Sequence, residues 1–171
     1  TDAGETPYAN SRNCLSVCNQ AAASISIIET KAWVVMRTVK LEELGFSVDS
    51  QPHHVAVEPN GSAWYVSLIG DSKVLKFDVD NSLLAQSEVI IQPALLGVHP
   101  NQNILYVSRF IDSQNPQTAI LGLDRNTLKG VSALEVGADA PHGLVIDHTG
   151  DFVYTSSLRD NKIISIFTLE N

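Results

Sequence analysis

The chain has 171 residues, the size of one globular domain with a substantial buried core. Apolar residues make up 44% of it and charged residues 18%, a composition that is ordinary for a β-rich globular protein and excludes intrinsic disorder. The formal net charge of −8 would repel phosphate groups, so the composition argues against nucleic acid and anionic membrane surfaces as partners.

No apolar run approaches the roughly 20 residues needed to cross a bilayer, so we expect no transmembrane segment. The chain begins at Thr1 and shows no signal peptide, as a processed, exported protein or an excised fragment would. We expect a periplasmic or extracellular location.

The first 51 residues predict an irregular, strand-rich unit. Residues 1–7 are polar and predict a loose terminus. Tyr8–Ser11 predicts the end of one strand, Ser24–Glu29 a second, and Trp33–Val39, rich in β-branched residues, an outer strand. Lys40–Asp49 then predicts a capping loop with one helical turn that Gly45 stops.

Two cysteines, Cys14 and Cys18, lie in the predicted connection between the first two strands, in the sequence NCLSVCN. We favour a disulfide that closes a small loop in an oxidising compartment, with two free thiols as the alternative. A metal pair ranks last, because structural zinc takes four ligands and no second Cys/His pair stands at the usual spacing.

A strand pattern that starts at Pro52 then repeats. Residues 52–92 predict four short strands, Val55–Val57, Ala63–Ser67, Lys73–Asp78 and Leu83–Ile91. The turn before the second of these strands contains Gly61, which supplies a positive φ. The pattern returns over residues 93–140 and 141–171, with Tyr65, Tyr106 and Tyr154 roughly 40 to 50 residues apart, a period typical of propeller blades.

The later copies differ from the first clear one in two ways. The copy at residues 93–140, the third blade, has Gln102 at the position that corresponds to Gly61. Asn101 or Asn103 is therefore expected to take the left-handed conformation. The copy at residues 141–171, the fourth blade, ends after its third strand, Ile163–Phe167. The predicted fold is therefore all-β, a single partial propeller-like domain of four-stranded antiparallel blades. Blade 1 (8–51) lacks its inner strand, blades 2 and 3 are complete, and blade 4 (141–171) lacks its outer strand.

The pattern Pro-His-x-Val-x-Val-x-Pro-Asn-Gly-x-x-x-Tyr-Val-Ser resembles the YVTN-type β-propeller repeats of bacterial envelope proteins. Their larger superfamily includes quinoprotein amine dehydrogenases, nitrous oxide reductase and lactonase-like propellers. The matching residues are Pro52, His53, Val55, Val57, Pro59, Asn60, Gly61, Tyr65 and Val66, then Pro141, His142, Gly143, Leu144, Ile146, Gly150 and Tyr154. The resemblance implies the fold and leaves the function open, because these repeats occur in catalytic and non-catalytic proteins. Family rings hold more blades than this chain supplies, which implies completion by a protein partner or a second copy.

Histidines occupy the start of the inner strands. His53 and His142 both follow the opening proline, and His54 adjoins the first. The resemblance to nitrous oxide reductase makes a copper or zinc site at the channel mouth one hypothesis. Such a site needs three or four converging donors, and Ala94 holds the equivalent position of the third copy. We favour histidines that bond the backbone of a neighbouring blade, and we expect no cofactor.

An exposed contact surface is predicted at Arg109 and Phe110 and in the long loop after them, which carries Asp112, Asn115 and Pro116. We interpret the chain as a non-catalytic envelope or extracellular interaction module whose ring another chain completes. One alternative is part of a redox or hydrolytic propeller enzyme with the histidine-lined mouth as its site. Another is a subunit of a membrane-associated complex, docked through the Cys14–Cys18 loop or the 111–117 loop.

Overall fold

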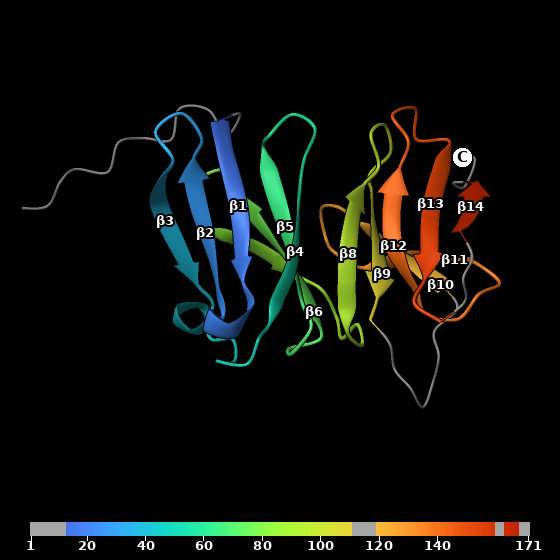
Figure 1. Cartoon of the computed structure of the whole chain (residues 1–171), viewed down its shortest axis with the longest axis horizontal. Coiled ribbons are helices and arrows are strands. Elements are labelled where there is room, and N and C mark those ends of the chain that lie inside the picture. Colours follow the sequence, from blue (N-terminus) through green and yellow to red (C-terminus); the bar gives the residue numbers. More distant parts are fainter. Residues whose placement is uncertain (1–12, 111–118, 160–162, 168–171) are drawn as a thin grey trace, which may run out of the picture.

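The computed structural model describes residues 13–110, 119–159 and 163–167, and the side chains of all of these except the last five. These residues form four antiparallel sheets, which follow one another along the chain in Figure 1. The predicted all-β architecture of propeller-like blades is confirmed. No helix in the described part of the chain is long and apolar enough to cross a membrane.

Blades 2 and 3 are complete four-stranded meanders. Blade 2 consists of β4 (Pro52–Val57), β5 (Ala63–Leu68), β6 (Lys73–Asp78) and β7 (Leu83–Gln86). Blade 3 consists of β8 (Pro93–Val98), β9 (Ile104–Arg109), β10 (Ala119–Asp124) and β11 (Gly130–Glu135). The outer strand of blade 2 ends at Gln86 rather than at the predicted Ile91, because the Ser87 hydroxyl accepts the Val74 N–H and interrupts the backbone ladder.

Blades 1 and 4 have three strands each among the described residues. Blade 1 consists of β1 (Cys14–Asn19), β2 (Ser24–Glu29) and β3 (Val34–Lys40), and blade 4 of β12 (Pro141–Ile146), β13 (Phe152–Ser157) and β14 (Ile163–Phe167). A 3₁₀ turn, η2 (Gln20–Ala22), links β1 to β2. The predicted helical turn after blade 1 is η3 (Glu42–Leu44), and Gly45 ends it with φ +86° as expected.

The first strand of blade 1 is not where the sequence placed it. The predicted Tyr8–Ser11 strand lies outside the described residues, and the predicted connection that carries the cysteines is itself the strand β1, paired with β2. Cys14 and Cys18 are both free thiols. Four residues of strand span about 13 Å, whereas disulfide-bonded Cα atoms lie within about 7 Å. The predicted Cys14–Cys18 disulfide is therefore wrong.

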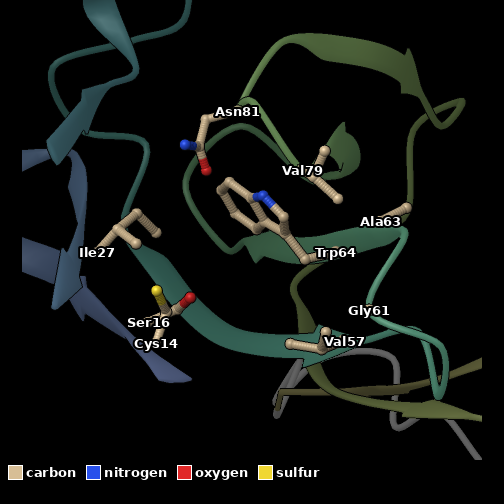
Figure 2. Close-up of a pocket in the computed structure, with 9 residues that line it drawn as sticks. All are labelled: Cys14, Ser16, Ile27, Val57, Gly61, Ala63, Trp64, Val79 and Asn81. Atoms are coloured by element: carbon tan, nitrogen blue, oxygen red, sulfur yellow. The ribbon is translucent and has the colours of Figure 1, made fainter. Parts of the chain in front are cut away.

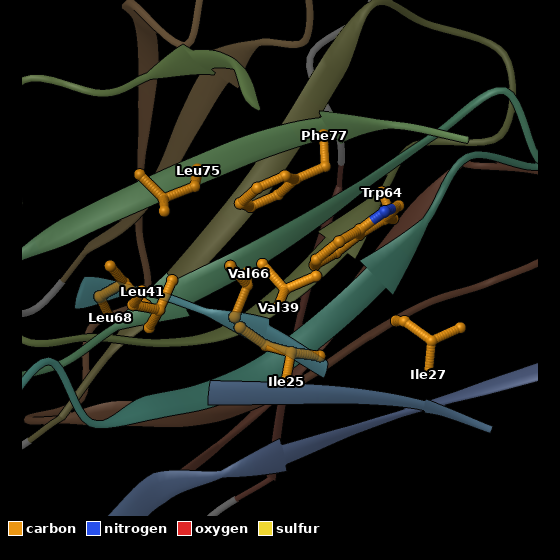
Figure 3. Packing of buried hydrophobic residues seen from close by; sticks show 9 residues of the cluster. All are labelled: Ile25, Ile27, Val39, Leu41, Trp64, Val66, Leu68, Leu75 and Phe77. Atoms are coloured by element: carbon orange, nitrogen blue, oxygen red, sulfur yellow. The ribbon is translucent and has the colours of Figure 1, made fainter. Parts of the chain in front are cut away.

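Apolar side chains fill the space between successive blades. Figure 3 shows the cluster between blades 1 and 2, which comprises Ile25, Ile27, Val39, Leu41, Trp64, Val66, Leu68, Leu75 and Phe77. Trp64 stacks on Phe77 at 4.3 Å between ring centroids and faces blade 1. Tyr65, the next residue, points to the opposite face of β5 and packs against blade 3, as alternation along a strand requires.

Candidate functional site

Each inner strand begins with a β-bulge. The register of β4 shifts between Pro52 and His54, and that of β12 between Pro141 and Gly143, so His53 and His142 are the extra residues. A bulge redirects the side chain of the residue it inserts. The two imidazole centroids lie 5.8 Å apart, and Phe110 sits edge-on to both, at 6.1 Å from His53 and 5.3 Å from His142. The structure therefore brings together one predicted contact residue and two of the predicted metal ligands.

His54 is held elsewhere. Its Nδ1 accepts the backbone N–H of Leu96, in the adjacent blade, at 3.2 Å. This is the role that the sequence favoured for the blade-opening histidines. His142 also bonds backbone, that of Arg109, while its Nδ1 is buried and has no partner among the described residues. No group of three or more His, Cys, Asp or Glu side chains within residues 13–110, 119–159 and 163–167 is arranged to hold a metal ion.

The electrostatics of the histidine pair favour neutral rings. Burial lowers the pKa of His53, and the proximity of His142 lowers it further. Burial likewise lowers the pKa of His54 and His142, with His53 and His142 adding to the effect on His54. Neutral imidazoles can hydrogen-bond, stack or ligate a metal.

The predicted contact surface is only partly exposed. Phe110 is 40% exposed, beside the two imidazoles. Arg109 is half-buried: its Nη2 donates to the Ala119 carbonyl at 3.4 Å, and burial lowers its pKa despite the opposing effect of Glu135. Arg109 thus braces β9 against β10 rather than forming an open surface. Asp112, Asn115 and Pro116 lie outside the described residues.

A polar latch joins blades 2 and 3 at the turn end of the sheets. Arg125 forms a largely buried ion pair with Glu58, 2.6 Å from Nη1 to Oε2. The Tyr65 hydroxyl donates to the same carboxylate, and Lys76 Nζ donates to the Arg125 carbonyl at 2.8 Å. Arg125 was not among the predicted functional residues, because a single arginine in a turn between two strands carries no local signal of this role.

A histidine makes the corresponding latch between blades 3 and 4. His99 Nε2 bonds the Gly150 carbonyl at 2.9 Å, and its Nδ1 accepts the N–H groups of Asn101 and Gln102. These bonds hold the turn without a left-handed residue, since neither Asn101 nor Asn103 has a positive φ. The predicted strain at those asparagines is therefore wrong, because the His99 ring takes over the stabilising role that glycine has elsewhere.

The outward faces of blades 1 and 4 are apolar and exposed. Tyr65 and Tyr106 are completely buried under the blade that follows each, whereas the equivalent Tyr154 is 40% exposed. Val145, which pairs with Tyr154 across β12 and β13, is 63% exposed. On blade 1, Leu15 and Val17 are exposed on the face of β1 opposite to Cys14 and Cys18, which pack toward blade 2. These side chains suit contact with further blades.

Comparison with known proteins supports the fold alone. No protein-family model matches the chain, and no curated protein matches it. Solved structures do match, among them hydrazine synthase from Kuenenia stuttgartiensis, with a TM-score of 0.77 and 19% sequence identity. That match covers 91% of this chain and 43% of the other, so the chain spans less than half the length of the structure it resembles.

Proposed function

We propose that this chain is a non-catalytic, propeller-type interaction module whose ring is completed by blades from a partner polypeptide, either a second copy or a different subunit. The observation that carries the proposal is the contrast among the three repeat tyrosines. Tyr65 and Tyr106 are fully buried under a following blade, while Tyr154 and its neighbour Val145 are left open. Partner strands on this face would bury both, as blades 3 and 4 do for the first two tyrosines.

The repeat motif supports a finer assignment. The residues shared by the copies from Pro52 and Pro141 favour a YVTN-type repeat protein of the bacterial envelope, and with it a periplasmic or extracellular location. Free thiols at Cys14 and Cys18 leave that location without support from a disulfide, so it rests on the repeat resemblance.

The histidine pair supports a second candidate function. His53 and His142 lie 5.8 Å apart between ring centroids, at the start of the inner strands. In a copper or zinc enzyme of which this chain is one part, these two histidines would be metal ligands. The blades that complete the ring would supply the further ligands. Metal analysis of the assembled protein tests this candidate, which requires roughly stoichiometric metal that is lost in a His53→Ala, His142→Ala variant.

A pair of matched substitutions tests the favoured function. Val145→Glu places a charge on the open face of blade 4, whereas Val131→Glu places the same charge at a similarly exposed valine, 56%, on the outer strand of blade 3. We expect V145E to release the partner, or dissociate the oligomer, in light scattering after gel filtration, and V131E to leave the assembly intact. The proposal would be contradicted if both variants assembled to the same extent as the unmodified protein.

A further inference from the structure

A pocket lies between blades 1 and 2 at the turn end (Figure 2). Its cavity volume is about 50 Å³, and the pocket opens to solvent. Its lining residues are Cys14, Ser16, Ile27, Val57, Gly61, Ala63, Trp64, Val79 and Asn81. None of these carries a carboxylate, ammonium or guanidinium group, so the pocket suits a neutral occupant.

The strand register explains why space is left here. Ser16 pairs with Ile27 in blade 1, Tyr65 with Lys76 in blade 2, and Tyr106 with Gly122 in blade 3. The three partners, Ile27, Lys76 and Gly122, each lie two residues before a carboxylate that accepts backbone N–H groups from the following turn. These carboxylates are Glu29, Asp78 and Asp124. The shared turn fixes the alignment of the blades. Ser16 therefore stands where the other blades carry their tyrosine.

The pocket is the slot that a tyrosine ring would fill. Tyr65 packs among Leu105, Leu123 and Leu128 of blade 3, and its hydroxyl reaches the Arg125 carbonyl at 3.3 Å. By the same alignment, Trp64 and Val79 of blade 2 correspond to Leu105 and Arg125, and both line the pocket. The short Ser16 side chain leaves empty the place that the phenol ring occupies in the next blade.

The slot also contains an unused hydrogen-bond donor. Trp64 is 6% exposed, and its Nε1 is buried with no partner among the described residues. Figure 2 shows this nitrogen on the edge of the indole toward Val79, the residue that replaces Arg125. An indole N–H can only donate, and leaving it unpaired costs free energy, so an acceptor oxygen in the slot would be favoured.

We propose that the slot left by Ser16 binds a neutral, single-ring phenol, with the ring in the position of the missing tyrosine and the hydroxyl oxygen accepting the Trp64 N–H. The repeat thus exchanges a structural side chain for a ligand at one of its blade interfaces. This inference does not depend on how the ring is completed.

The probe is 4-methylphenol, which has the atoms of a tyrosine side chain. Trp33 is 71% exposed and outside the pocket, so Trp33→Phe leaves a single indole N–H resonance, that of Trp64. We expect saturable movement of this resonance on titration, and binding about tenfold weaker for toluene, which lacks the oxygen that accepts one hydrogen bond. A Trp64→Phe variant, followed by the Gly61 and Ala63 amides, should bind the two probes equally.

The decisive variant is Ser16→Tyr, which restores the repeat's own ring; it should abolish 4-methylphenol binding and raise Tm. Leu15→Tyr adds the same residue on the opposite, exposed face of β1 and should leave binding unchanged. If S16Y fails to fold, the proposal is tested by comparing 4-methylphenol with toluene binding, in the protein that keeps Trp64 and in the W64F variant. Absence of saturable binding, or equal binding by S16Y, overturns the proposal. Tyr8→Ala is a further arm: binding that appears only in Y8A would show that the chain's own tyrosine fills the slot, which also overturns it.

Discussion

At the scale of single residues, the tyrosine of each repeat sets the packing between blades. Tyr65 combines a fully buried ring with a hydroxyl bonded to Glu58, and burial together with that carboxylate raises its pKa. Arg125 from the next blade completes the arrangement. One aromatic ring thus supplies apolar contact, while its hydroxyl joins a polar latch at the surface end of the interface.

Glu58→Gln should lower the free energy of unfolding by about 3 kcal/mol, because it leaves the Arg125 charge largely buried without its partner. Tyr65→Phe removes one hydrogen bond and should cost about 1 kcal/mol. Urea denaturation of both variants gives the comparison. A cost for E58Q no greater than that of Y65F would mean that the ion pair does not stabilise the interface.

The histidine cluster should make stability depend on pH. The lowered pKa values of His53, His54 and His142 mean that the unfolded chain binds protons below about pH 6.5 that the folded chain does not. Stability present above that pH is therefore lost as the pH falls toward the folded-state pKa values. Thermal unfolding between about pH 7.5 and about pH 5 should show a falling Tm, with a flatter profile for a His53→Gln, His142→Gln variant. An unchanged profile in that variant would exclude the pair as the cause.

At the scale of elements, the turns hold the blades in register through side chains. Gly150 illustrates this, because it combines φ +85° with close packing, and a Cβ there would overlap the His99 ring that bonds its carbonyl. Gly45 has nearly the same φ, +86°, but open space around it. The two glycines separate backbone strain from loss of the latch.

Gly45→Ala should cost about 1 kcal/mol, the strain of a left-handed alanine. Gly150→Ala should cost about 3 kcal/mol, since displacement of His99 adds to the same strain. Chemical denaturation measures both. If the two variants lose equal stability, the His99 contact contributes nothing to the interface between blades 3 and 4.

Individual strands and turns could be predicted from the sequence, whereas contacts between distant turns could not. Strands with alternating apolar residues and glycine turns were recognised, as Ala63–Leu68 and Lys73–Asp78 show, because period and turn chemistry act locally. Cys14–Asn19 was missed because Ser16 replaces the tyrosine that marks the strand elsewhere. The meeting of His53 with His142 was anticipated from equivalent positions, whereas the Glu58–Arg125 pair joins distant turns that no local pattern connects.

At the scale of the whole molecule, four blades stand side by side, and the outward faces of the two end blades, 1 and 4, are apolar. The inner strands β4, β8 and β12 are neighbours, so each interior interface repeats the same apolar packing. Tyr154 and Val145 at one end, and Leu15 and Val17 at the other, carry the same kind of surface into solvent. Exposed patches of this kind mark interaction surfaces in folded proteins.

The native mass of the purified, unmodified chain tests the central claim most directly. Native mass spectrometry at micromolar concentration should find an assembly heavier than the 18.5 kDa monomer, either a homo-oligomer or a stoichiometric complex with a second polypeptide. Either mass would show that partner strands cover the open faces. A stable monomer of 18.5 kDa, still folded and with no co-purifying partner, would contradict the account.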